Sequence, residues 1–222
     1  MKLYPAILTD SIEVVEQQLQ LAKSLSSVEA VQIDIIDGVF ADNLTVTPID
    51  LINLDFGELK LDFHLMVEEP LDYLNEIVQY QKFLPIRAVL GQIERMSSQD
   101  EFIELTKKSG FLAGLSIDLF TPITEIKESL ISKLDVVQLM SIEAGFQGQK
   151  FDERVIKKII ELNKIRNTKN NKLEIILDGG IKEAHLEQLK KLKADGVAVG
   201  SWLWKNDKPE FVVQMINSKN ST

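Results

Sequence analysis

Short apolar runs alternate with longer amphipathic segments along this chain, and the alternation predicts βαβ units around a parallel sheet. Runs rich in β-branched residues indicate strands that are buried on both faces. We place eight strands near residues 2–8, 29–35, 59–65, 85–93, 112–117, 134–140, 173–177 and 195–199. Eight such units favour a closed (β/α)8 barrel, the TIM barrel, over an open sheet.

The segments between these strands show helical features in several places. Residues 155–162 carry apolar side chains at helical spacing. Ser98, followed three residues later by glutamate, and Thr121, followed directly by proline, are typical of helix starts. Residues 36–48 and 141–151 are the longest connections without a helical stripe, so we interpret them as loops that enclose a substrate.

The length and composition fit one domain. The chain has 222 residues, of which 45% are hydrophobic, and α/β barrels often take about 200–250 residues as a single unit. No repeat, low-complexity segment or linker divides the chain. We therefore expect one barrel domain over residues 1–222, with a short polar tail from about residue 217.

Charge and cysteine content exclude some functions. The formal net charge is −9, whereas nucleic-acid binding requires clustered lysine and arginine, so we expect no nucleic-acid partner. The chain has no cysteine, which excludes disulfides and thiolate zinc sites. We find no signal-peptide pattern and no stretch approaching the ~20 apolar residues of a membrane span. A cytoplasmic protein without a membrane partner is the expectation.

Two apolar stretches each run into an aspartate and then a glycine-marked turn. Asp34 lies in residues 29–38 and Asp178 in residues 173–181, while His64 has a similar place on a third predicted strand. A carboxylate at a strand exit escapes the cost of burial only if water, a metal or a partner meets it. Because the carboxyl ends of barrel strands form one functional face, these three side chains indicate a metal or proton-transfer site.

Glycines also follow the last two predicted strands, as Gly179 with Gly180 and as Gly200 with Ser201. Barrels commonly bind a phosphate at these places through backbone N–H groups. The alternative is that both pairs merely turn the chain from strand to helix, but their joint occurrence favours a phosphate site. His185, on a segment rich in lysine and glutamate, is interpreted as solvated helix surface.

Six short motifs occur in the order that they have in the ribulose-phosphate 3-epimerase family. They are Pro5-Ala-Ile-Leu8, Asp34-Ile-Ile-Asp-Gly38 with Asn43-Leu-Thr45, His64-Leu-Met66, Met140-Ser141 with Gly145-Phe-Gln-Gly-Gln-Lys-Phe151, Asp178-Gly-Gly-Ile181, and Gly200-Ser201. A single short motif recurs by chance, whereas six in sequence are a strong signal. The chain resembles this family of (β/α)8 barrels over almost its whole length.

The resemblance implies inversion at carbon 3 of a ketose phosphate, which interconverts D-ribulose 5-phosphate and D-xylulose 5-phosphate. Asp34 and Asp178 would be the acid/base pair, and with His64 they would bind a divalent cation: Zn, Fe, Mn, Co or Mg. The resemblance also implies that the binding partner is a small-molecule ketose phosphate. A homo-oligomer is possible and is left open. Substrate and phosphate contacts would come from Met66, Met140, Gly145, Gly148, Gly179, Gly180, Gly200 and Ser201.

Gln32 is the main departure from the family, which usually has histidine there. A glutamine oxygen binds borderline metals more weakly than imidazole, so Gln32 is an optional fourth ligand that favours Mg²⁺ or Mn²⁺ over Zn²⁺. Gln147 replaces a glycine and would strain its loop if that position needs a positive φ. Further departures are Ala6, Ile36, Gln92, Asp118 with Leu119, and Ala144, and together they indicate a divergent member.

Three interpretations therefore stay open. The first is a metal-assisted phosphosugar epimerase, acting on ribulose 5-phosphate or on a different ketose phosphate. The second is a noncatalytic or weakly active phosphosugar-binding barrel that has lost full metal capture through Gln32. The third is another phosphate-handling barrel enzyme, such as an aldolase or decarboxylase, which needs a lysine at a strand exit; no lysine interrupts residues 34–38, 64–66 or 178–181.

Overall fold

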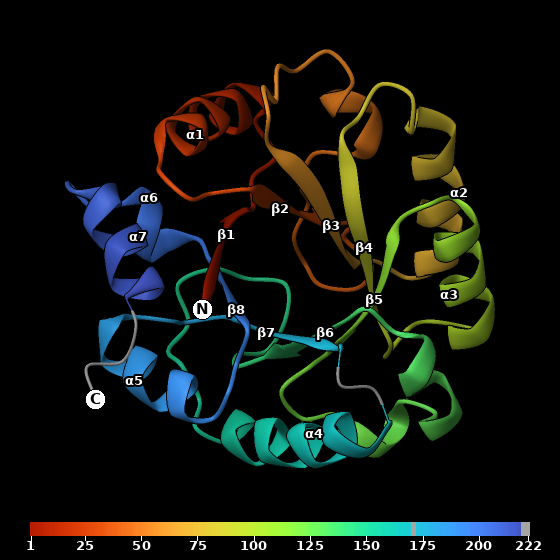
Figure 1. The fold of residues 1–222 in the computed structure, drawn as a ribbon. Coiled ribbons are helices and arrows are strands. Elements are labelled where there is room, and N and C mark those ends of the chain that lie inside the picture. The colour runs from red at the N-terminus through yellow and green to blue at the C-terminus, as the bar shows by residue number, and fades with distance from the viewer. Residues whose placement is uncertain (170–171, 219–222) are drawn as a thin grey trace.

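Eight parallel strands close into a barrel in the computed structural model, which describes residues 1–169 and 172–218 (Figure 1). They pair in chain order, and β8 returns to β1. Each predicted strand is confirmed within two residues at either end. The strands are β1 (Lys2–Ile7), β2 (Ala30–Ile36), β3 (Lys60–Met66), β4 (Ile86–Gln92), β5 (Leu112–Ile117), β6 (Val136–Met140), β7 (Glu174–Asp178) and β8 (Gly196–Val199).

Helices surround the barrel and complete the predicted (β/α)8 fold (Figure 1). The α-helices are α1 (Ile12–Ser24), α2 (Pro70–Tyr80), α3 (Gln99–Lys108), α4 (Val155–Lys169), α5 (Glu183–Lys191), α6 (Ser201–Trp204) and α7 (Pro209–Asn217). The crossovers after β2 and β5 contain 3-10 helices instead, namely η1 (Pro48–Leu51), η2 (Ile123–Glu125) and η3 (Glu128–Lys133). The predicted tail from about residue 217 begins where α7 ends, and its residues 219–222 lie outside the described residues.

The two predicted helix starts have different outcomes. Ser98 is the N-cap of α3, and its hydroxyl accepts a hydrogen bond from the backbone N–H of Glu101, as the capping pattern predicts. At Thr121 no α-helix begins: the chain enters η2 after Pro122, and η2 is three residues long. The fifth crossover is therefore built from short 3-10 helices.

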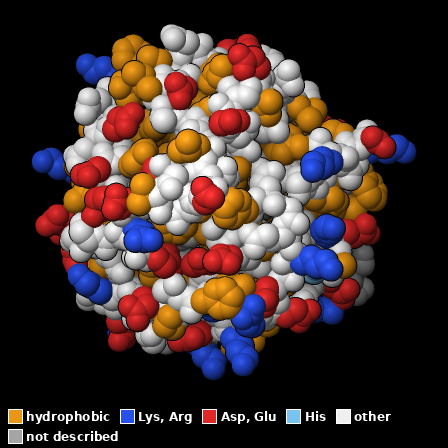
Figure 2. Space-filling view, turned by 180° about the vertical axis from the view of Figure 1, so that it is seen from behind, with side chains coloured by type: hydrophobic (Ala, Val, Ile, Leu, Met, Phe, Trp, Pro, Cys, Tyr) orange, Lys and Arg blue, Asp and Glu red, His pale blue; other side chains and the backbone are white. Residues whose placement is uncertain are grey.

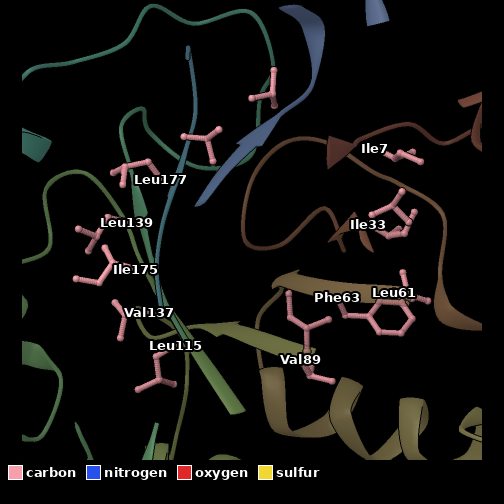
Figure 3. Close-up of a cluster of buried hydrophobic side chains, with 14 of the residues drawn as sticks. Ile7, Ile33, Leu61, Phe63, Val89, Leu115, Val137, Leu139, Ile175 and Leu177 are labelled. Carbon is pink, nitrogen blue, oxygen red and sulfur yellow. The ribbon is translucent and has the colours of Figure 1, made fainter. Parts of the chain in front are cut away.

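Side chains of each strand alternate between two layers. Outward side chains such as Ile33, Phe63 and Leu139 are fully buried and pack into the apolar layer between the strands and the helices (Figure 3). Asp34 and His64, which alternate with them, point into the barrel and contact one another. The barrel interior is thus where this chain places its buried polar groups.

The amino-terminal end of the barrel is closed by a second polar cluster. Arg87 donates to both carboxylate oxygens of Asp62, from Nε over 2.8 Å and also from Nη2, and its guanidinium lies 4.7 Å from the centre of the Tyr4 ring. The Tyr4 hydroxyl donates to Glu174 Oε1 over 2.5 Å. Burial raises the pKa of Asp62, although the hydrogen bond and charge of Arg87 oppose the shift. This cluster ties together β1, β3, β4 and β7 at the end opposite the motif residues.

Acidic and basic side chains are interspersed on the face drawn in Figure 2. Within residues 1–169 and 172–218, we find no helix with the length and apolar character required to cross a membrane.

Candidate active site

The structure brings Asp34, His64 and Asp178 together inside the carboxyl end of the barrel. Asp34 on β2 and His64 on β3 are register partners, and Asp178 is the last residue of β7. One oxygen or nitrogen atom from each lies within 4.8 Å of the others. His64 Nδ1 is 3.1 Å from Asp34 Oδ1 and 3.8 Å from Asp178 Oδ2. The three strands therefore bring these side chains close enough to form one site.

Gln32 lies between the two carboxylates. Its amide nitrogen donates to Asp34 Oδ1 over 2.8 Å and to Asp178 Oδ2 over 2.7 Å. The expected ligand atom of Gln32 is its amide oxygen, so the amide would have to turn before Gln32 could bind a cation. In the present arrangement Gln32 holds the carboxylates together through N–H donors.

Gln138 is a member of the site that the sequence analysis missed. This fully buried side chain on β6 donates from Nε2 to Asp178 Oδ2 over 3.0 Å, and Nε2 is 3.2 Å from His64 Nδ1. Gln138 lies in an apolar strand and in no recognised motif, so the available sequence signal was one polar residue in an otherwise hydrophobic run.

Burial and charge perturb the titration of this site. Burial first, and then the negative charge of Asp34, raise the pKa of Asp178 to about 7. Burial opposes protonation of His64, but the hydrogen bond and charge of Asp34, together with the charge of Asp178, outweigh it and raise the pKa of His64. The site therefore favours holding a positive charge or a proton between the two carboxylates.

The donor set fits a divalent cation. His64 Nδ1 faces both a carboxylate oxygen of Asp34, which is an acceptor, and the amide N–H of Gln138, which is a donor. A proton on Nδ1 suits only the carboxylate, and a lone pair suits only the amide. A cation held by His64, Asp34 and Asp178 would remove this conflict, because the amide could then donate to Asp178 alone. The buried group Asp34, His64 and Asp178 could thus hold a metal ion.

A cavity of about 240 Å³ opens above the two carboxylates. Asp34 and Asp178 lie in its wall, whereas Gln32 and His64 are almost completely buried beside them. The volume is smaller than the roughly 300–1,000 Å³ of pockets for drug-sized ligands, as suits a small metabolite. The wall includes every predicted substrate or phosphate residue, namely Met66, Met140, Gly145, Gly148, Gly179, Gly180, Gly200 and Ser201.

The glycines after β7 are required by the loop that covers the cavity. Gly179 and Gly180 have φ values of 108° and 63°, which glycine adopts readily. A Cβ atom on Gly180 would lie 2.3 Å from the backbone nitrogen of Phe151, so only glycine allows this approach of the β6–α4 loop. Lys150 and Lys182 also line the cavity and bring positive charge to this side.

Gln147 and His185 differ from their expected environments. Among the described residues, the only non-glycine residues with positive φ are Ser27 and Lys193, so Gln147 is not strained as a glycine replacement could be. The Gln147 amide instead donates across the cavity to the carbonyl oxygen of Leu8 over 3.3 Å. His185 lies on α5 as predicted, but it is only half-exposed, because its ring is stacked 4.3 Å from that of Phe151 in the loop before α4.

The fold and the site define a (β/α)8-barrel enzyme with two carboxylates and an imidazole at the mouth of the barrel. The sequence profile of the ribulose-phosphate 3 epimerase family matches residues 2–204, and the chain belongs to this family. It is accordingly an enzyme of the isomerase class, a carbohydrate epimerase by family.

Individual relatives agree with the family match. The ribulose-phosphate 3-epimerase of Aquifex aeolicus is 32% identical over 203 residues, which cover 91% of this chain and 89% of the relative. That of Bacillus subtilis is 28% identical and covers 98% of this chain and 99% of the relative. The tryptophan synthase A-subunit from Pyrococcus furiosus superposes with a TM-score of 0.66 over 97% of this chain and 96% of that chain. At 14% identity, this last similarity shows the fold alone.

Proposed function

We propose that the chain inverts carbon 3 of a ketose phosphate, interconverting D-ribulose 5-phosphate and D-xylulose 5-phosphate. The observation that carries the proposal is the pair Asp34 and Asp178, which reach one cavity from β2 and β7. Inversion needs a proton acceptor on one face of carbon 3 and a proton donor on the other. Two carboxylates in one cavity wall meet this demand.

In the proposed reaction, one aspartate takes the proton from carbon 3 and the other returns a proton to the opposite face. Gln32 and His64 hold the two carboxylates in place through contacts of 2.7–3.1 Å. A divalent cation at this site would stabilise the negative oxygens of the enediolate. Its oxygen-rich ligands favour a hard ion such as Mn²⁺ or Mg²⁺ over Zn²⁺.

The rest of the cavity suits the remainder of a ketose phosphate. Met66 and Met140 form an apolar cover beside the carboxylates, and apolar cover limits access of water to the enediolate. The phosphate would lie by the glycines after β7 and β8, which line the cavity where barrels commonly bind phosphate through backbone N–H groups. Lys150 and Lys182, whose ammonium groups have no carboxylate within ion-pair distance in the described residues, supply charge for the anion.

A barrel that binds phosphosugars with little or no turnover is the second candidate. The observation in its favour is the amide nitrogen of Gln32 between the carboxylates, in the place where a metal ligand is expected. A Schiff-base enzyme has no such support, because the lysines of the strands, Lys2 and Lys60, stand at their amino-terminal ends.

The experiment that separates the candidates combines turnover with metal content. Purified protein is assayed with D-ribulose 5-phosphate, and its metals are measured by elemental analysis. The proposal predicts turnover that falls at least about 10²-fold in both Asp34→Asn and Asp178→Asn. Phosphosugar binding without turnover would support the second candidate, and wild-type rates in either variant would contradict the two-base assignment.

A further inference from the structure

The side-chain amide of Gln138 contacts two residues of the candidate site. It lies on β6 between the outward-facing Val137 and Leu139 and points into the barrel. Its amide nitrogen is 3.0 Å from Asp178 Oδ2 and 3.2 Å from His64 Nδ1. One amide group thus reaches both a proposed proton carrier and a proposed metal ligand.

Asp178 Oδ2 is held from two sides of the barrel. Gln32 on β2 donates to it over 2.7 Å, and Gln138 on β6 donates over 3.0 Å. Two N–H donors to one oxygen restrict rotation of the carboxylate. Hydrogen bonds of this kind also orient carboxylates and imidazoles that bind metal ions.

Packing alone does not account for Gln138. Its side chain is completely buried, and its Oε1 atom has no hydrogen-bond partner among the protein atoms. An unsatisfied buried carbonyl costs free energy, whereas an apolar side chain of similar size would not have this cost. This cost is explained if the amide orients Asp178 and His64.

We propose that Gln138 is a positioning residue, which fixes Asp178 and His64 in the arrangement that binds a divalent cation and moves the proton at carbon 3. The effect on turnover rests on the proposed function. The effect on cation binding rests only on the contacts of Gln138 and can be measured without substrate.

The test compares Gln138→Met, which keeps the length of the side chain and removes the amide, with Ser116→Ala. Ser116 is the register partner of Gln138 on β5, is equally buried, and contacts none of Gln32, Asp34 or Asp178 through its hydroxyl. Gln138→Leu is measured in parallel, so that a packing defect of one replacement does not decide the result. Circular dichroism selects folded variants, Mn²⁺ affinity is measured by calorimetry, and kcat and KM are measured with ribulose 5-phosphate.

We expect Gln138→Met and Gln138→Leu to bind Mn²⁺ about 10–100-fold more weakly than the wild type, as for other groups that orient metal ligands. We expect kcat to fall by about tenfold or more while KM changes by less than about threefold, because the phosphate contacts are untouched. Ser116→Ala should keep wild-type values. A merely structural role would not lower cation affinity and kcat selectively at an unchanged KM.

Three results would overturn the proposal: wild-type Mn²⁺ affinity in both folded Gln138 variants, equal losses in Ser116→Ala, or a wild type that binds no Mn²⁺. Failure of the proposed function has a different signature. If Mn²⁺ binding by the wild type depends on Gln138 but the protein turns over no ketose phosphate, the positioning role is supported and the proposed reaction is wrong.

Discussion

Replacing Asp178 by asparagine should stabilise the metal-free protein at alkaline pH while it removes activity. Burial and the charge of Asp34 raise the pKa of Asp178 from its ordinary value of 3.8 to about 7. The folded protein therefore resists ionisation of Asp178, whereas the unfolded chain does not. Asparagine has nearly the same shape and cannot ionise, so the variant avoids this cost.

The size of the effect follows from the difference of about three pKa units, which corresponds to about 4 kcal/mol of unfolding free energy at about 1.4 kcal/mol per unit. Because the folded pKa is raised, the wild type loses stability as the pH rises from about 3.8 to about 7, and the advantage of the variant grows over the same range. The asparagine amide cannot match every hydrogen bond of the carboxylate, which subtracts about 1 kcal/mol. We expect the variant to be more stable than the wild type by a few kcal/mol above pH 8, and to have no advantage near pH 4.

Urea denaturation at pH 5, 6, 7, 8 and 9 in the presence of EDTA measures this difference. EDTA is needed because a bound cation would itself stabilise the folded state. Asp207→Asn, at an exposed position, is the control and should change stability by less than about 0.5 kcal/mol at every pH. If Asp178→Asn is no more stable than the wild type at pH 8, or if its advantage does not grow with pH, the reasoning is refuted.

Three further substitutions test other parts of the structure. Arg87→Met should lower the free energy of unfolding by about 3–5 kcal/mol, because it leaves the buried Asp62 without its partner. Its kcat should be unchanged, since this pair lies at the opposite end of the barrel. Gly180→Ala should raise KM for a ketose phosphate and cost about 1–3 kcal/mol of stability, from its φ of 63° and from contact with Phe151. Gln32→His should raise Zn²⁺ affinity by about tenfold or more, and Mg²⁺ affinity less, when measured by calorimetry.

Each of these has a matched comparison. Arg154→Met breaks an exposed pair with Asp152 and should lower stability far less than Arg87→Met does, so equal losses would argue against a special role for Arg87. Gly110 also has a positive φ but no atom within 4 Å of an added Cβ, so Gly110→Ala should leave KM unchanged. The control for Gln32→His is Gln92→His, which should keep wild-type Zn²⁺ affinity. An unchanged Zn²⁺ affinity in Gln32→His would mean that position 32 does not face the cation site.

The fold could be predicted from the sequence because its strands are short and mostly apolar. Fully buried parallel strands produce such runs, and all eight were placed from them. The conformation of the fifth crossover was not predicted, because a Thr-Pro start at Thr121 is compatible with any helical turn. Tertiary packing there gives the 3-10 helices η2 and η3.

The candidate site was accessible only in part. Asp34, His64 and Asp178 were identified because strand exits and family motifs mark them, and the barrel brings them together. Gln138 was missed because its contact with Asp178 joins residues 40 positions apart, and only the pairing of β6 with β7 creates it. Likewise, the position of the Gln32 amide nitrogen depends on two carboxylates from different strands.

The central claim is that Asp34 and Asp178 move a proton on opposite faces of carbon 3. The most direct test is NMR of D-ribulose 5-phosphate incubated with the protein in D₂O. The account predicts D-xylulose 5-phosphate that carries deuterium at carbon 3, because the returned proton comes from an aspartate in exchange with solvent. No conversion, or a product that retains the original hydrogen at carbon 3, would contradict it.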